Sequence, residues 1–407
     1  MSKILNKNII KQAVAKYPTP FYLYDASGMI SASTKLSNAF KWDKGFKNYF
    51  AVKALPNISI LKLLVAKGMG LDCSSLTELM LAEKVGVSGN DIMFTSNNTS
   101  TEEFILAKKL GAIINLDDIT HIEFLEKNAS LPELLCFRYN PGNIAKGNEI
   151  IGYPEEAKFG MTKKQILEAV KICQQKGVKE FGLHQMVISN NLNRQVALDI
   201  ARLIFKLADE IYKKYDVRLK FINLGGGIGI PYKPDEKEFN VQDFANGVEK
   251  LLKSTLNYEP AIYMECGRYI TGPYGNLIST VQHIKQTYKT YIGLDASMHN
   301  LMRPGLYGAY HQITILDKPH SSSKNIYDVT GSLCENNDKF AVNRELPKID
   351  IGDIAVIHDT GAHGHSMGFN YNGKLRSAEI MIDQNDSLSL IRRAENASDY
   401  LKTLELK

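Results

Sequence analysis

The segment Tyr49-Phe-Ala-Val-Lys53 begins the series of short apolar runs that decides the fold. From about residue 47 to residue 268, such runs alternate with stretches that have helical spacing of apolar residues. The predicted strands are Tyr49–Lys53, Gly70–Cys73, Ile92–Thr95, Ala112–Leu116, Leu134–Tyr139, Phe181–Ile188, Phe221–Leu224 and Ala261–Glu265. Strands that alternate with helices form parallel sheets, and eight such units favour a (β/α)8 barrel over an open, doubly wound sheet.

The pattern changes after Tyr274, where β-rich segments replace the long helical patterns. We therefore predict a barrel domain over residues 30–274, and a mostly antiparallel β-barrel or sandwich domain built from residues 1–29 and 275–407. Phe21–Asp25 (FYLYD) also has the composition of a strand, and it could join either sheet.

Composition and charge exclude several classes of protein. The 407 residues carry 49 basic and 44 acidic side chains, and the net charge of +5 is too small to indicate nucleic-acid binding. The five cysteines are odd in number and have no CxxC spacing, which argues against a disulfide framework or a cysteine zinc site and favours the cytoplasm. There is no signal peptide and no membrane-spanning run, so we expect no membrane partner.

Polar residues and glycines gather at the carboxyl ends of the predicted barrel strands. Barrel enzymes build their active sites at that face, often with a phosphate pocket after strands seven and eight. The residues in question are Lys53, Asp72, Arg138, His184, Gly225, Gly226, Gly227, Glu265, Gly267 and Arg268.

Lys53 stands out because it closes an otherwise apolar strand. Partial burial there would lower the pKa of its amine and leave a nucleophile that can attack a carbonyl group. The alternative is a lysine at a strand end that extends to water. Asn223-Leu-Gly-Gly-Gly-Ile-Gly229 is a second candidate, since unhindered backbone amides can approach phosphate oxygens, and Arg268 could add charge. A glycine-rich turn alone is equally often structural.

The second domain holds three segments dense in polar residues. One places Arg303 and Tyr307 four residues apart, and another sets Cys334 beside Glu335. The third, Asp359–Asn372, contains Tyr371 and two histidines, but an HxH pair without a third ligand nearby is a poor metal signal, and we expect no metal.

Together these segments resemble the fold-type III, pyridoxal phosphate-dependent amino acid decarboxylases, and most of all the diaminopimelate decarboxylases. The resemblance runs from about Thr19 to Ile382. The segments that carry it are TPFYLYD, YFAVKALPN, GLDCSSLTEL, KFGM, NLGGGIG, ECGRYI, DASMHNLMRPGLY, CENND and GAHGHSMGFNYN. The family combines an eight-fold barrel with a β domain, and it forms obligate homodimers with shared active sites.

The resemblance implies a role for each candidate residue. Lys53 would bind pyridoxal 5'-phosphate covalently, and Glu265 would pair with its pyridine nitrogen. The other residues implied around the cofactor are Asp72, Met186, Ser189, Gly225, Gly226, Gly227, Gly267, Arg268 and Tyr371. The implied substrate contacts are Arg268, Arg303, Tyr307, Glu335 and Tyr371. Cys334, from the segment that the family contributes across the dimer interface, would be the acid that returns a proton.

This chain departs from the family pattern in strand six, which usually reads HxHxGSQ. Here Met186 replaces the histidine that stacks on the cofactor ring, and Ile188 replaces a glycine beside the phosphate. A methionine sulfur can still contact an aromatic ring, but it cannot titrate as imidazole does. Cys266 in place of a proline and His363 in place of a tyrosine are smaller departures.

Three functions follow as hypotheses. The first is decarboxylation of meso-2,6-diaminopimelate to L-lysine, because two arginines suit a substrate with a carboxylate at its far end. The second is decarboxylation of another diamino or D-amino acid, such as D-lysine or D-ornithine. The third is cofactor binding without turnover, which the changes at Met186 and Ile188 would explain. An alanine racemase would need a catalytic tyrosine in the second domain.

Overall fold

The chain forms two compact units in a computed structural model, which describes residues 6–144, 153–318 and 325–405. The barrel unit comprises residues 31–230 and 237–269, and the β unit comprises residues 1–30, 231–236 and 270–407. The barrel unit therefore ends five residues before the expected boundary at 274 and lacks the Pro-rich segment 231–236.

The barrel unit is built on eight parallel strands that close on themselves, as the sequence predicted. Each strand pairs in register with its neighbours along the chain, and β2 pairs with β9 to close the ring. The strands are β2 (Lys47–Ala51), β3 (Gly70–Cys73), β4 (Ile92–Ser96), β5 (Ile113–Leu116), β6 (Leu134–Tyr139), β7 (Glu180–Gln185), β8 (Phe221–Asn223) and β9 (Ala261–Met264).

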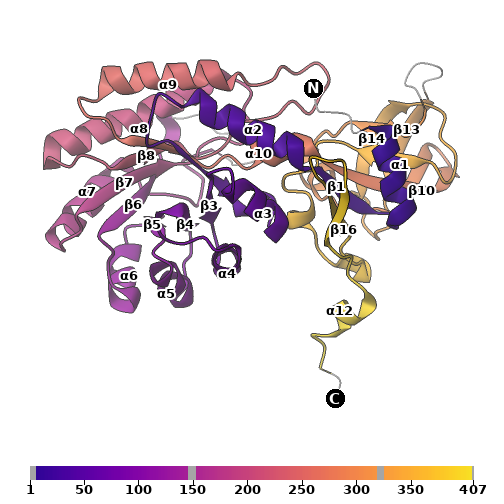
Figure 1. The fold of residues 1–407 in the computed structure, drawn as a ribbon, viewed down its shortest axis with the longest axis horizontal. Coiled ribbons are helices and arrows are strands. Elements are labelled where there is room, and N and C mark those ends of the chain that lie inside the picture. The colour runs from indigo at the N-terminus through magenta and orange to yellow at the C-terminus, as the bar shows by residue number, and fades with distance from the viewer. Residues whose placement is uncertain (1–5, 145–152, 319–324, 406–407) are drawn as a thin grey trace. The chain divides into compact units, whose positions relative to one another are not determined.

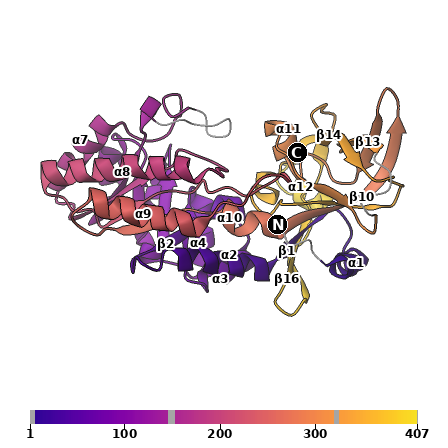
Figure 2. The same cartoon turned by 90° about the horizontal axis from the view of Figure 1, so that it is seen from above.

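Helices connect successive strands and lie outside the barrel (Figure 1). They are α2 (Ala26–Ala39), α3 (Ile58–Val65), α4 (Leu76–Val85), α5 (Thr101–Lys109), α6 (His121–Ala129), α7 (Lys163–Gln175), α8 (Arg194–Tyr215), α9 (Val241–Thr255) and α10 (Arg268–Thr271). Figure 2 shows α8 and α9 side by side. Capping boxes mark the start of two of these helices. Ser100 pairs with Glu103 at the start of α5, and Thr162 pairs with Gln165 at the start of α7, and each pair satisfies backbone groups of the first helical turn.

Large aromatic side chains fill the barrel interior because glycines on neighbouring strands make room for them. Tyr49, Met93, Ile113, Cys136 and Phe221 form one buried cluster. A Cβ atom on Gly182 would lie 2.1 Å from the Phe221 ring, so any larger residue there would displace that ring. This packed layer lies inside the barrel and supports the residues at the strand ends.

The β unit contains a sheet of nine described strands. Most of the strand pairs in this sheet are antiparallel, as predicted. The strands are β1 (Phe21–Asp25), β10 (Gly275–Gln286), β11 (Thr290–Leu294), β12 (Ile313–Ile315), β13 (Asn325–Thr330), β14 (Lys339–Leu346), β15 (Ile354–Ile357), β16 (Ala378–Ile382) and β17 (Leu388–Arg392). The helices are α1 (Lys7–Lys16), α11 (Arg303–Tyr307) and α12 (Ala397–Leu401).

β1 joins this sheet between β10 and β16, which settles the choice that the sequence left open. The apolar face of α1 packs on it through Ile9 and Ile10, beside Phe21 and Ile380. Among the described helices, none is long and apolar enough to cross a membrane.

Candidate active site

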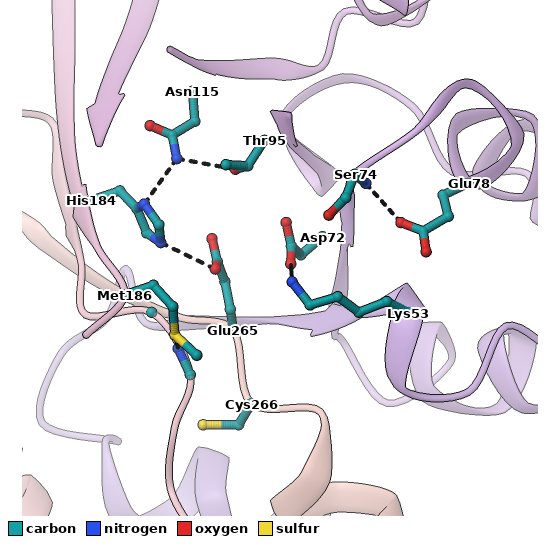
Figure 3. A network of polar contacts seen from close by, with 12 residues as sticks. Lys53, Asp72, Ser74, Glu78, Thr95, Asn115, His184, Met186, Glu265 and Cys266 are labelled. Atoms are coloured by element: carbon teal, nitrogen blue, oxygen red, sulfur yellow. Dashed lines mark hydrogen bonds and ion pairs between the residues drawn. The ribbon is translucent and has the colours of Figure 1, made fainter. Parts of the chain in front are cut away.

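Lys53 lies in the single 3-10 turn η1 (Val52–Ala54), directly after β2. The predicted strand is two residues too long, because the backbone turns after Ala51. The side chain is 54% exposed, so the amine is about half-buried and reaches solvent. Its Nζ atom lies 3.9 Å from Oδ2 of Asp72, which places the amine at the carboxyl end of the barrel (Figure 3).

Asp72, on β3, is only 2% exposed, and its Oδ1 atom has no hydrogen-bond partner among the residues that the structure describes. Burial raises its pKa well above the usual range, and the nearby carboxylate of Glu265 raises it further, while Lys53 opposes both effects. A buried carboxyl oxygen without a partner is costly, and it is typical of a position that awaits a ligand.

A chain of hydrogen bonds crosses the barrel from β4 to the end of β9 (Figure 3). Nδ2 of Asn115 lies 3.0 Å from Oγ1 of Thr95 and 2.9 Å from Nδ1 of His184. Nε2 of His184 lies 3.2 Å from Oε2 of Glu265, and Nδ2 of Asn223 donates to Oε1 of Glu265 over 2.8 Å. Both carboxylate oxygens of Glu265 are thus held by donors.

Glu265 is an anion in this environment. Burial alone would raise its pKa, but electrostatic interactions with His184 and Lys53 and the hydrogen bonds from His184 and Asn223 lower it to about 2. Two buried carboxyl groups at one barrel end therefore have pKa values shifted in opposite directions, Asp72 upward and Glu265 downward. Such a division is typical of sites that need one anion and one proton-carrying group.

The glycine turn after β8 packs tightly against the ends of β7 and β9. A Cβ atom on Gly225 would lie 2.2 Å from the Gln185 carbonyl oxygen, and one on Gly226 would lie 2.7 Å from that of Glu265. Gly225 and Gly227 also have positive φ angles of 69° and 91°. The three glycines are therefore required by the turn itself.

Two amides of this turn are already engaged within the protein. The Gly225 amide donates to Oδ1 of Asn223, and the Gly226 amide donates to Sδ of Met186 over 3.3 Å. A thioether is a weak acceptor, which an anionic oxygen would outcompete. Met186 therefore lies directly over the glycine turn, while Ser189 follows in the same loop and Ile188 packs against Gly227.

Gly267 and Arg268 follow Glu265 where the chain enters α10. A Cβ atom on Gly267 would lie 2.7 Å from that of Ala54, so this glycine permits close packing beside the Lys53 turn. Asn48 clamps the same segment, since its side chain bonds to both the amide and the carbonyl oxygen of Cys266. Arg268 is buried.

The remaining candidates lie in the β unit. Arg303, at the start of α11, is only 3% exposed, whereas Tyr307 at the end of that helix is exposed. Cys334 and Glu335 are exposed on a turn that Asp338 organises by accepting bonds from the amides of Met298 and Leu333.

Cys334 and Tyr371 belong to neighbouring loops. The main-chain amide of Cys334 donates to Oδ1 of Asn372 over 2.8 Å, and Asn372 follows Tyr371, which is exposed. His365 in the preceding loop has its ring engaged by the Ser377 carbonyl oxygen and Arg376. The described residues contain no group of three or more potential metal ligands.

Sequence reasoning missed Thr95, Asn115 and the role of Asn223. Each is a polar residue in an otherwise apolar strand (IMFTS, IINL, FIN), and that signal could have found them. It also gave no role to Glu78, whose carboxylate accepts from the Ser74 amide in the same part of the barrel (Figure 3).

The fold and this arrangement define a class of enzyme, and comparison with known proteins gives the same class. Residues 30–272 match the model of the family described as pyridoxal-dependent decarboxylase, pyridoxal binding domain. The chain belongs to the pyridoxal phosphate-dependent decarboxylases, and it is an enzyme of the carboxy-lyase type.

The relatives extend over nearly the whole chain. Protein TabA of Pseudomonas amygdali pv. tabaci is 42% identical over 96% of this chain and 92% of its own length. The diaminopimelate decarboxylase of Methanothermobacter thermautotrophicus is 31% identical over 95% of this chain and 92% of its own length. The crystal structure of diaminopimelate decarboxylase from Helicobacter pylori complexed with L-lysine superposes with a TM-score of 0.90 at 30% identity, and it covers 97% of this chain and 98% of that one.

The barrel-end residues fit pyridoxal phosphate. The half-exposed amine of Lys53 can react with the aldehyde, the unpartnered Oδ1 of Asp72 can accept a hydrogen bond, and the anionic Glu265 can hold a protonated pyridine nitrogen. The Gly226 amide can exchange its thioether acceptor for a phosphate oxygen.

Proposed function

We propose that this enzyme decarboxylates the D-configured end of meso-2,6-diaminopimelate and releases CO2 and L-lysine, a step of lysine biosynthesis. Relatives at about 30% identity that align over their full domains are named diaminopimelate decarboxylases, and solved structures of such enzymes hold L-lysine. These matches support the substrate class, while the 42% identity to Protein TabA leaves room for another amino acid.

One observation carries the proposal: the buried residue at the start of α11 is an arginine. Arg303 is a permanent cation with planar donors that match a carboxylate, and its guanidinium is held by an imidazole and an aromatic ring. A substrate whose far end carries a carboxylate, as diaminopimelate does, would match these planar donors, whereas ornithine would bring a second cation.

The roles of the barrel residues follow from their chemistry. Pyridoxal phosphate, when bound, supplies a sink for the electron pair that remains on the substrate carbon after CO2 departs. Lys53 binds the cofactor covalently, and Glu265 keeps the pyridine nitrogen protonated. Met186 contacts the ring. The residues proposed around the phosphate are Ser189, Gly225, Gly226, Gly227, Gly267 and Arg268.

The far end of the substrate and the returning proton involve residues of the β unit. Arg303 binds the distal carboxylate, Glu335 meets the distal ammonium group, and Tyr307 and Tyr371 supply hydroxyl groups. Cys334 donates the proton that replaces CO2 on the substrate carbon, and its thiolate is reprotonated from solvent. We propose that Cys334 and Glu335 act in the active site of the partner subunit of a homodimer.

The exposed thiol also suggests where the protein works. Four of the five cysteines are buried, and Cys334 is exposed. An exposed catalytic thiol remains usable in a reducing compartment, and we therefore propose the cytoplasm.

A second candidate is decarboxylation of another D-amino acid, such as D-lysine or D-ornithine. It is favoured by Met186, whose sulfur accepts from the Gly226 amide at the position where the family has a ring-stacking histidine. A thioether neither donates a proton nor titrates, so the side chain beside the cofactor ring differs chemically from the imidazole of the family.

A substrate panel tests both candidates. Purified enzyme loaded with pyridoxal phosphate is supplied with meso-diaminopimelate, D-lysine, D-ornithine or L-ornithine, and CO2 release is measured as kcat/KM. We expect meso-diaminopimelate to be preferred by at least about tenfold, because one additional charged hydrogen-bonded pair is worth about 1.5–3 kcal/mol. Preference for D-lysine or D-ornithine would establish the second candidate, and preference for L-ornithine would refute both.

A further inference from the structure

Arg303 belongs to a buried cluster of four residues of the β unit, and the proposed mechanism gives no role to the other three. Nη1 of Arg303 lies 2.8 Å from Nε2 of His311, and Nδ1 of His311 lies 2.8 Å from the carbonyl oxygen of His358. Cζ of Arg303 lies 4.6 Å from the centroid of the Tyr232 ring. Tyr232, His311, Arg303 and His358 are all buried.

These partners leave His311 one protonation state. A guanidinium only donates hydrogen bonds, so Nε2 of His311 accepts and carries no proton. A carbonyl oxygen only accepts, so Nδ1 of His311 carries the proton. His311 is therefore a neutral imidazole in the Nδ1–H form, with its lone pair directed at Arg303. Arg344 strengthens this assignment, since its Nη1 atom donates to the His311 carbonyl oxygen and adds a second cation nearby.

The imidazole is itself held on both sides. His358, whose carbonyl accepts from His311, lies directly after β15, and its Nε2 atom is 2.7 Å from Oγ1 of Thr314 on β12. The ring of Tyr232 packs edge-on against His311, with centroids 5.0 Å apart at 70°. Tyr232 comes from segment 231–236, which follows the glycine turn in the chain but belongs to the β unit.

We infer that His311, which the His358 carbonyl group orients, is a positioning residue that sets the orientation of the Arg303 guanidinium. The Tyr232 ring packs against one face of that guanidinium and contributes to the same role. His311 and Tyr232 thereby determine the selectivity for ligands with a distal carboxylate. This inference rests on the proposed function, in which Arg303 binds that carboxylate. Neither residue needs to touch the substrate. The neutral imidazole of His311 fixes the direction of one guanidinium N–H group of Arg303, and the ring face of Tyr232 fixes the plane of the guanidinium.

Product binding isolates this role from the chemical step. L-Lysine keeps the distal carboxylate of diaminopimelate, whereas cadaverine, the product from D-lysine, lacks it. Dissociation constants of both compounds are measured calorimetrically on the cofactor-loaded enzyme. For His311→Phe we expect the affinity for L-lysine to fall about tenfold more than the affinity for cadaverine, as for loss of one charged hydrogen bond. His311→Gln, which offers an amide oxygen to Arg303, should recover part of that difference.

Kinetics and a matched control separate positioning from folding. With meso-diaminopimelate, His311→Phe should raise KM and change kcat little. Tyr232→Leu should act in the same direction, while Tyr232→Phe, which keeps the ring, should not. The control is His299→Phe, another buried histidine of the β unit, whose Nε2 atom lies 3.0 Å from the Leu375 carbonyl oxygen. It should lower the melting temperature without changing the ratio of the two affinities.

Equal weakening of L-lysine and cadaverine binding in His311→Phe, or no change in either, overturns the inference. The variant Arg303→Gln distinguishes failure of this inference from failure of the proposed function. If Arg303→Gln weakens L-lysine binding selectively and His311→Phe does not, only the inference is wrong. If Arg303→Gln leaves L-lysine binding unchanged, Arg303 does not bind the distal carboxylate, and the inference falls together with that part of the proposed function.

Discussion

Nε2 of His184 lies 3.2 Å from Oε2 of Glu265, while Nδ1 of the same imidazole accepts from the side-chain amide of Asn115 over 2.9 Å. With Nδ1 accepting, Nε2 carries the proton and donates to the carboxylate. Asn223 donates to the other oxygen of Glu265. The barrel thus orders this anion with its own side chains, as a preorganised electrostatic site requires.

Replacing Glu265 tests what that anion does. In Glu265→Gln, we expect kcat for decarboxylation to fall at least about 100-fold, because a preorganised charge of this kind is commonly worth that much. The cofactor should still attach to Lys53, which absorbance in the visible range reports.

Glu78→Gln is the matched control for Glu265. Glu78 is a partly buried carboxyl group at the same barrel end, but it lies in the first turn of α4 and accepts from the backbone amide of Ser74. It should keep kcat within about threefold of the parent value. A kcat for Glu265→Gln equal to that of the parent enzyme would contradict the proposed role of the Glu265 carboxylate.

The stability of the cofactor-free enzyme should depend on pH through Asp72. Burial and Glu265 raise its pKa in the folded state, so the folded protein binds this proton more tightly than the unfolded chain does. Stability from this group is therefore fully present below the unfolded pKa of 3.8 and is lost as pH rises through the folded pKa. Asp72→Asn should raise the melting temperature at pH 8 by about 2 °C, and by less at pH 5.

Asp117→Asn is the control for the pH experiment. Asp117 is also buried, but it is paired with Arg138 at 3.0 Å and accepts from the Gly160 amide. Replacing Asp117 by asparagine should lower the melting temperature, because it leaves the partly buried guanidinium of Arg138 without its anion. A lower melting temperature for Asp72→Asn at both pH values would show that the Asp72 carboxylate is stabilising.

Gly226→Ala should weaken cofactor binding. Its new methyl group would lie 2.7 Å from the Glu265 carbonyl oxygen, which belongs to rigid backbone, so the turn must move away from the end of β9. Fluorescence titration with pyridoxal phosphate should show at least about a tenfold loss of affinity. Gly293→Ala on β11, where the nearest atom would be 3.4 Å away, should leave the affinity unchanged. Equal affinity in Gly226→Ala and the parent would exclude this turn from the cofactor site.

Hybrid dimers test the proposed sharing of active sites. Lys53→Ala and Cys334→Ala should each be inactive as homodimers. A heterodimer with two-fold symmetry would contain one site with both native residues, so random exchange should restore about one quarter of the parent activity. The measurement is CO2 release after mixed refolding, with subunit exchange confirmed by mass spectrometry. Exchange without recovery would place Lys53 and Cys334 of one active site in the same subunit.

The sequence predicted the fold because local signals agree with the tertiary structure. Leu134–Tyr139 is a strand with the predicted bounds, and helix starts such as Ser100 carry their own capping residues. The end of β2 differed because the turn at Lys53 depends on its neighbours, including the close approach of Gly267 to Ala54. The sequence signals of β13 and β14 are weak, since each strand carries polar or exposed residues and bulges interrupt their pairing.

The candidate site was predictable only where single residues carry the chemistry. Lys53 and Glu265 are conspicuous because each follows an apolar strand directly or within two residues. The contacts between Asn115 and His184, or between Tyr232 and Arg303, join residues far apart in the chain. No periodic pattern encodes such contacts, because they depend on barrel closure and on the path of segment 231–236.

The most direct test of the proposed function is isotopic. Meso-diaminopimelate carrying 13C only in the carboxyl group of its D-configured end is incubated with the cofactor-loaded enzyme, and both products are analysed by mass spectrometry. We predict that all released CO2 carries 13C and that the amino acid formed is unlabelled L-lysine. Release of unlabelled CO2, or recovery of intact diaminopimelate while another amino acid of the panel is decarboxylated, would contradict the proposal.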